Sequence, residues 1–153
     1  MGAADGVPGL APGLSASVRA VVTDADTAEL AGSGDVPVLA TPRLLALAEA
    51  ATVAAVAPYL APGTTSVGTL VSLEHRRASP VGAEVEVEAE LTEVAGRRLV
   101  FSFIARDIRL ARLAAPDGGE RAVVGAGTVE RVMVDRGTFL ARLQEPGPDR
   151  PAS

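Results

Sequence analysis

Apolar and polar residues alternate along five stretches of the chain, and each of these stretches predicts a β-strand. The five stretches are residues 14–24, 66–78, 83–94, 99–113 and 122–134. The alternation is clearest in 83–94, where four glutamates share one face and four apolar residues share the other. Because successive strand side chains point to opposite faces of a sheet, we expect the glutamate face to lie in solvent. The inward face of 99–113 is predicted to hold Leu99, Phe101, Phe103 and Ala105.

Residues 41–58 have a helical spacing instead and predict one long α-helix. Thr41 is followed by Pro42, and a threonine N-cap before a proline at the first helical position is a common helix start. Both sides of the helix are apolar, with Glu49 as the exception. A helix that is apolar all round is buried all round, so we expect it to be wrapped by a sheet or covered by a partner. A loop is predicted at 26–38 and a short terminal helix at 135–143.

The order of these elements predicts an α+β domain, because the helix is separate from a run of hairpin-connected strands. One long central helix wrapped by a curved antiparallel β-sheet is the hot-dog fold. We expect residues 14–143 to form this domain, residues 1–13 to be a flexible N-terminus and residues 144–153 to be a disordered tail. The exposed edges of such a sheet need cover, so we also expect dimerisation.

Composition narrows the classes of function. The chain of 153 residues has no cysteine and one histidine, which excludes disulfides, thiolate chemistry and a His-rich zinc site, so we expect no metal. Its net charge of −5 argues against nucleic-acid binding, which needs a basic surface. The longest apolar run, residues 44–56, is too short to span a membrane, and the N-terminus lacks the pattern of a signal peptide. We therefore expect a soluble, cytoplasmic protein.

His75 and Glu49 are the candidates for acid–base chemistry. His75 follows Val67, Thr69, Val71 and Leu73 at alternate positions of a predicted strand. We expect these side chains to share one inward face. A carboxylate beside such a histidine fixes its tautomer and makes it a competent base near neutral pH. The structural alternatives are a histidine that is merely packed in the core and a glutamate that pairs with an arginine across a dimer interface or reaches solvent at the helix edge. A buried carboxylate without a partner is costly, so Glu49 requires one explanation or the other.

Other polar residues are weaker candidates for a functional role. The helix start at Thr41 is also a place where backbone amides favour a developing anion. Arg76 and Arg77, like Arg97 and Arg98, are candidates for binding phosphate, although paired arginines at strand ends are commonly just solvated. The segment 125–127, Gly-Ala-Gly, is not a phosphate-binding loop, because it lies inside a strand pattern and no helix follows. Its glycines indicate a bulge or a close approach of two backbones.

Several stretches of the chain resemble the fluoroacetyl-CoA thioesterase family of the hot-dog fold. They are residues 38–49, 57–63, 66–69, 74–75, 79–82, 94–99 and 125–131, so the resemblance covers roughly residues 14–143. The spacing from threonine to glutamate to histidine matches the catalytic set of that family. This spacing is more specific than any single motif in the chain.

The resemblance implies a homodimeric, metal-free enzyme that hydrolyses an acyl-CoA thioester, with no cofactor beyond the CoA of its substrate. The catalytic residues of the family fall on Thr41, Glu49 and His75. His75, oriented by Glu49, would activate water or assist acyl transfer, and Thr41 would be a nucleophile or a hydrogen-bond donor. The family's glycine beside the thioester falls on Gly68, and we add Arg76 as a candidate substrate-binding residue.

Three departures from the family leave the acyl group open. Residues 26–38 hold no aromatic side chain, although the family has aromatic residues before the helix; Ala50 stands where the family has tryptophan; and the hairpin at 108–121 is longer. Two other functions remain as alternatives: a hot-dog module that binds acyl-CoA without turnover, and a hot-dog dehydratase or hydratase acting on acyl thioesters. The sequence does not decide whether dimers pair into tetramers.

Overall fold

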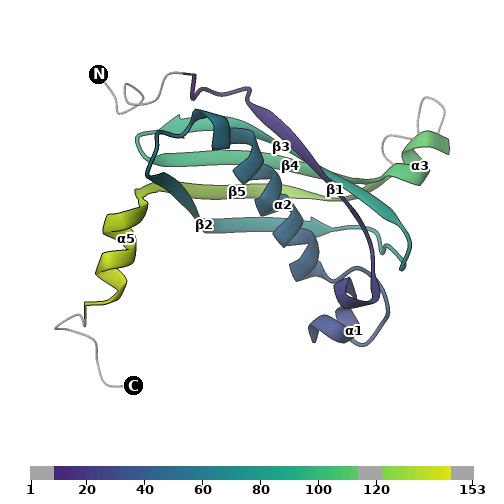
Figure 1. Ribbon diagram of the computed structural model, residues 1–153. Helices are drawn as coiled ribbons and strands as arrows, with labels where there is room; N and C mark the ends of the chain where they lie inside the picture. Colours follow the sequence, from purple (N-terminus) through teal and green to yellow (C-terminus); the bar gives the residue numbers. More distant parts are fainter. Residues whose placement is uncertain (1–8, 114–121, 146–153) are drawn as a thin grey trace.

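A five-stranded antiparallel sheet and one long helix on its face form the body of the protein (Figure 1). The computed structural model describes residues 9–113 and 122–145. The strands are β1 Ser15–Val21, β2 Thr64–His75, β3 Glu84–Ala95, β4 Arg98–Asp107 and β5 Val123–Asp135. Their order in the sheet is β1-β3-β4-β5-β2, so β1 and β2 are the two edge strands. The predicted α+β class, with one antiparallel sheet and one long helix, is confirmed.

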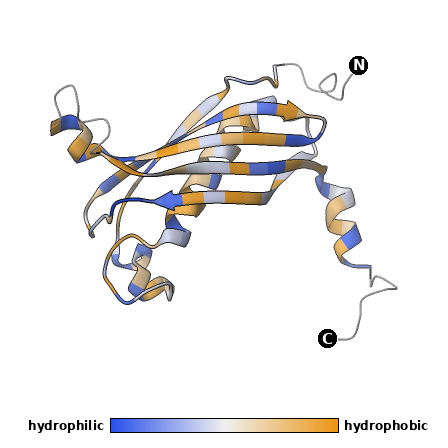
Figure 2. Ribbon diagram, turned by 180° about the vertical axis from the view of Figure 1, so that it is seen from behind, coloured by the Kyte–Doolittle hydropathy of each residue, from blue (hydrophilic) through white to orange (hydrophobic). Residues whose placement is uncertain are grey.

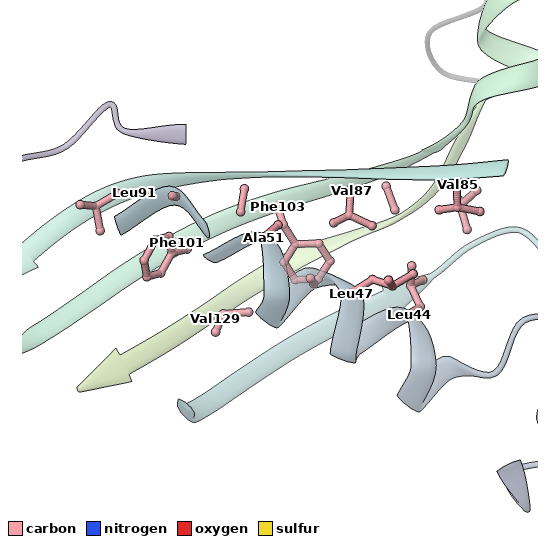
Figure 3. Packing of buried hydrophobic residues seen from close by; sticks show 14 of the residues in the cluster. Leu44, Leu47, Ala51, Val85, Val87, Leu91, Phe101, Phe103 and Val129 are labelled. Carbon is pink, nitrogen blue, oxygen red and sulfur yellow. The ribbon is translucent and has the colours of Figure 1, made fainter. Parts of the chain in front are cut away.

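Helix α2 (Thr41–Val56), followed by the 3-10 turn η3 (Ala57–Tyr59), lies across the sheet. Its buried face packs on apolar side chains of β3, β4 and β5, among them Phe101 and Phe103 (Figure 3). The opposite face is open, and Val53 on it is 44% exposed. The prediction of burial on all sides is therefore wrong for a single copy of the chain, because the sheet covers only one side of the helix.

Strands β3 and β4 have the predicted alternation. Residues Val85, Val87, Ala89 and Leu91 of β3 are buried, as are Leu99, Phe101, Phe103 and Ala105 of β4. The hairpin between the two strands turns at Gly96, whose positive φ of 61° suits glycine. Figure 2 shows the resulting bands of apolar and polar residues along the strands.

Strand β2 departs from the predicted alternation because its register shifts between Gly68 and Leu70. The extra residue, Thr69, forms a β-bulge, which moves one half of a strand to the opposite face. Gly68 lies opposite Arg131 of β5, which is buried, whereas Leu70 lies opposite Glu130 and is 61% exposed. The prediction that Val67 and Thr69 share the face of His75 is therefore wrong. Gly68 takes the inward position.

The segment 26–38 is not the plain loop that its composition predicts. It follows the 3-10 turn η2 (Asp24–Asp26) and contains the short helix α1 (Ala28–Ala31). The side chain of Asp26 accepts hydrogen bonds from the backbone and hydroxyl of Thr23, and Thr27 caps α1 through Leu30. These local bonds between side chain and backbone compete with an irregular loop, and composition alone does not reveal them.

The fourth predicted strand, 99–113, is also too long. It ends at Asp107, and helix α3 (Ile108–Leu113) follows, because Asp107 accepts a hydrogen bond from the backbone N–H of Leu110. The terminal helix is confirmed as α5 (Arg136–Leu143), capped by Asp135 and extending away from the sheet (Figure 1). Residues 114–121 of the hairpin at 108–121 lie outside the described residues, as do residues 1–8 and 146–153.

The glycines of β5 mark a close approach of two backbones, as predicted. A Cβ atom on Gly125 would lie 2.7 Å from the carbonyl oxygen of Glu74, and one on Gly127 would overlap the carbonyl of Ser72. Both contacts are with β2, so these glycines let β2 lie close against β5 next to His75. No helix among the described residues is long and apolar enough to cross a membrane.

Candidate active site

The first turn of α2 and the last residue of β2 meet at a hydrogen bond. Thr41 Oγ1 lies 2.8 Å from His75 Nδ1. Thr41 is not the N-cap, as the sequence suggested: Ala40 holds that position, Thr41 is the first helical residue, and no side chain caps the helix. Thr41 therefore lies one position further into the helix than predicted, and this changes what its hydroxyl contacts. The hydroxyl is directed to the imidazole, and the backbone N–H groups of the first helical turn are left without a side-chain acceptor.

The surroundings of His75 make its imidazole a weaker base than usual. Burial lowers its pKa below the ordinary value, and a contact with the backbone of Arg77 opposes this only in part. The second ring nitrogen, Nε2, is buried and has no hydrogen-bond partner among residues 9–113 and 122–145. A neutral imidazole has one donor nitrogen and one acceptor nitrogen. If Nδ1 accepts from the Thr41 hydroxyl, then Nε2 carries the hydrogen and needs an acceptor.

Thr41 and His75 line a cavity of about 320 Å³. Its wall on the side of α1 is aliphatic and includes Ala28, Val38 and Leu39. Arg76 lines the same cavity, and its half-exposed side chain forms an ion pair with Glu74. The cavity is thus apolar on one side and carries polar groups at the helix start and at the end of β2.

Glu49 lies elsewhere, two turns further along α2. Its Oε2 atom is 3.3 Å from Arg131 Nη1 of β5, and Arg131 also donates to the hydroxyl and the carbonyl oxygen of Ser66. The Arg131 side chain is 8% exposed and that of Glu49 is 38% exposed. Burial lowers the pKa of Arg131, and the charge of Glu49 opposes that shift. Arginine stays protonated in proteins, so the pair is ionic.

Gly68 lies directly against the carboxylate of Glu49. A Cβ atom at Gly68 would lie 2.6 Å from Glu49 Oε2, so any side chain there would displace the carboxylate. The bulge at Thr69 is what turns Gly68 inward. The two candidate residues Glu49 and Gly68 are therefore brought together, with Arg131 as their third member.

Within one copy of the chain, this second group does not reach His75. Gly68 and His75 lie opposite Arg131 and Gly125, six positions apart on β5, which at the usual strand rise is about 20 Å. The predicted pairing of Glu49 with His75 is thus not formed inside a single copy. Glu49 instead forms an ion pair with an arginine of the same copy, and not across a dimer interface as the alternative had it.

Arg131 is the polar residue of the site that sequence reasoning did not single out. A signal was present, because Arg131 alternates with Val129 and Met133, which are both buried. An arginine at an inward strand position needs an acidic partner. Glu49, the charge on the apolar helix, was its natural match.

Comparisons with known proteins agree on one family. The family model of the fluoroacetyl-CoA-specific thioesterase matches residues 22–137. The fluoroacetyl-CoA thioesterase of Streptantibioticus cattleyicolor is 39% identical over 111 residues, which are 72% of this chain and 71% of that protein.

Solved structures are similar over nearly the whole chain. A fluoroacetyl-CoA thioesterase variant in complex with acetyl-CoA has a TM-score of 0.75 and 31% identity, covering 91% of this chain and 100% of that one. A thioesterase superfamily member from Thermus thermophilus also has a TM-score of 0.75, with 24% identity over 90% of this chain and 93% of that one. The second likeness supports the fold alone.

Proposed function

The chain belongs to the fluoroacetyl-CoA-specific thioesterase family, and from that premise we propose that it hydrolyses an acyl-CoA with Thr41, Glu49 and His75 as catalytic residues. Two variants of one relative, the fluoroacetyl-CoA thioesterase, have been solved, one with acetyl-CoA and one with fluoroacetate. The proposal needs no cofactor beyond the CoA of the substrate, and no metal. A cytoplasmic location is part of it and depends on the sequence interpretation alone.

The contact between Thr41 and His75 at the cavity carries this proposal. A hydroxyl 2.8 Å from an imidazole nitrogen can pass its proton to that nitrogen while it attacks a thioester carbonyl, or can donate a hydrogen bond while His75 activates water. Because burial favours the neutral imidazole, His75 is in the form that accepts a proton. The uncapped N–H groups at the start of α2 are suited to stabilise the oxyanion that develops on the carbonyl.

Glu49 completes this site from a second copy of the chain. Within one copy, Glu49 is too distant to face the imidazole of His75. Strand β2 is an edge strand with apolar side chains exposed, Leu70 at 61% and Val71 at 41%. An unpaired edge of this kind is suited to pair with a second edge. Antiparallel pairing of β2 with its copy would run His75 back toward Gly68 of the partner subunit, where the partner's Glu49 lies.

In this homodimer each residue has a defined role. The partner's Glu49, held in place by the partner's Arg131, faces the imidazole of His75 and stabilises its protonated form. Gly68 leaves the space that this carboxylate occupies, and we keep it as a candidate substrate-binding residue. Arg76, at the edge of the cavity, is placed to contact a CoA phosphate, since guanidinium groups bind phosphate through two donors.

Release of free thiol from a panel of acyl-CoAs tests the activity. We expect thiol release from at least one member of the panel, at a rate proportional to enzyme concentration. Binding of CoA or acyl-CoA without thiol release from any member would instead establish the alternative of a non-catalytic module. Hydration or dehydration of an unsaturated acyl-CoA, with the thioester intact, would establish the other alternative.

The sole histidine of the chain allows a direct test of the site's electrostatics by proton NMR, because a single imidazole titrates. Burial lowers the pKa of His75, whereas a facing carboxylate raises it. In the Glu49→Gln variant burial and the weaker opposing effect of the Arg77 backbone remain, so we expect the histidine to titrate below its ordinary pKa and below its pKa in the wild type. An unchanged titration curve in Glu49→Gln would contradict a carboxylate facing the imidazole. Glu88→Gln, on the exposed face of β3, is the control for a general loss of negative charge.

A further inference from the structure

The cavity beside Thr41 and His75 is large for a two-carbon acyl group. Its volume of about 320 Å³ is about twice that of an apolar protein cavity known to hold a benzene molecule. Part of this space must take the thioester group itself. The remainder has room for an acyl chain of several carbons.

The aliphatic side chains in the wall of the cavity are suited to an uncharged, aliphatic ligand. Ala28, Val36, Val38 and Leu39 line it from the segment before α2. This segment holds no aromatic residue, so nothing bulky from it fills the space. Gly34 comes close to the wall as well, since a Cβ there would lie 3.2 Å from that of Ala28. Within this lining Val36 is 50% exposed, and the charged residues Asp35, Arg76 and Arg77 are exposed as well.

This wall is fixed in place by hydrogen bonds and is therefore preformed. The backbone N–H of Ala28 donates to Val38, that of Leu39 to Ser79 and that of Ala40 to Asp26, with distances of 2.8, 2.8 and 2.9 Å. Arg43 of α2 forms an ion pair with Asp26, which ties the segment to the first turn of the helix. A pocket that is already shaped loses little ordering entropy when an apolar group enters.

We propose that the acyl group of the substrate is an uncharged aliphatic chain of about four to eight carbons, bound between residues 36–39 and the pair Thr41 and His75. This inference rests on the proposed thioesterase activity at the same site. It assigns the residues before α2 as those that select the acyl group. The two-carbon acyl groups of the family's solved complexes would leave most of this cavity unused.

Kinetics on straight-chain acyl-CoAs from two to ten carbons test the proposal. We expect kcat/KM to rise about three- to fourfold for each added methylene, as each is removed from water, and to fall once the cavity is full. In Val36→Phe we expect a loss of at least about tenfold for hexanoyl-CoA with acetyl-CoA changed less than about twofold. Val21→Phe, an exposed valine of β1 outside the cavity, should leave the profile unchanged. A profile that peaks at acetyl-CoA or fluoroacetyl-CoA, or one that is flat, would overturn the proposal.

Equilibrium binding of S-alkyl-CoA thioethers separates this inference from the activity. These analogues carry the chain but cannot be hydrolysed. Tighter binding of S-hexyl-CoA than of S-ethyl-CoA, lost in Val36→Phe, would support the acyl class even if no thioester were hydrolysed and the proposed activity failed. Equal binding of the two thioethers would refute the acyl class even if thioesterase activity were present.

Discussion

Replacing His75 by glutamine is expected to lower kcat for the best acyl-CoA substrate by about 10²–10⁴-fold, with KM changed little. Glutamine can still accept a hydrogen bond from the Thr41 hydroxyl, but it cannot take up a proton. The variant therefore removes the base while leaving much of the packing at the end of β2. Because proton transfer occurs only in the transition state, the loss should appear in kcat rather than in substrate binding.

The measurement is steady-state thiol release by the wild type and the variant at saturating substrate. Ser72→Ala is a suitable control, since Ser72 is an exposed residue of the same strand and does not line the cavity. Comparison of melting temperatures shows whether the His75→Gln chain is folded. A folded His75→Gln protein with wild-type kcat would eliminate His75 as the base and, with it, the mechanism proposed for Thr41.

The sequence correctly predicted which residues of β3 and β4 face inward, because each strand has one face in the core and one in solvent. The alternation of apolar and polar residues along these strands therefore matches which side chains are buried. Strand β2 is different, since a single inserted residue, Thr69, reverses the face of everything before it. No local pattern indicates the bulge, because it depends on pairing with β5. The inward position of Gly68 therefore came from the resemblance to a family and not from periodicity.

The candidate site was likewise predictable in its residues but not in their contacts. The contact of Thr41 with His75 joins residues 34 positions apart, and the ion pair of Glu49 with Arg131 joins residues 82 positions apart. Sequence reasoning found Glu49 and His75 because both are polar residues in apolar surroundings. It then assumed that they meet. The fold separates them within one copy, and only the geometry of helix and sheet could show this.

Glu49→Gln is expected to be nearly inactive on its own, with kcat reduced about 10²–10⁴-fold, because the imidazolium that forms in the transition state loses its facing carboxylate. The change should cost only about 1 kcal/mol of stability, since Glu49 is 38% exposed and the amide oxygen can still accept from Arg131. Ser66 continues to bind the same guanidinium. The loss of activity would then be chemical and not a consequence of unfolding.

The two inactive variants should restore activity when they share a dimer. If His75 of one copy works with Glu49 of the partner subunit, a dimer of His75→Gln with Glu49→Gln has one site with both substitutions and one site with neither. Random pairing at equal concentrations makes about half of the dimers mixed, so the mixture should recover about one quarter of wild-type activity. Co-expression of the two variants with different tags, followed by thiol release from doubly purified dimers, measures this directly. Those purified mixed dimers should have about half of wild-type activity per dimer.

A pairing of His75→Gln with His75→Ala is the matched control, because every site in such a dimer lacks the histidine. It should show no recovery at any ratio. If the pairing of His75→Gln with Glu49→Gln also showed none, although mixed dimers had formed, the two residues would not act across the interface. The exposed edge of β2 makes recovery the expected result, since this edge can pair with its copy and the carboxylate of Glu49 in the same chain is out of reach of His75.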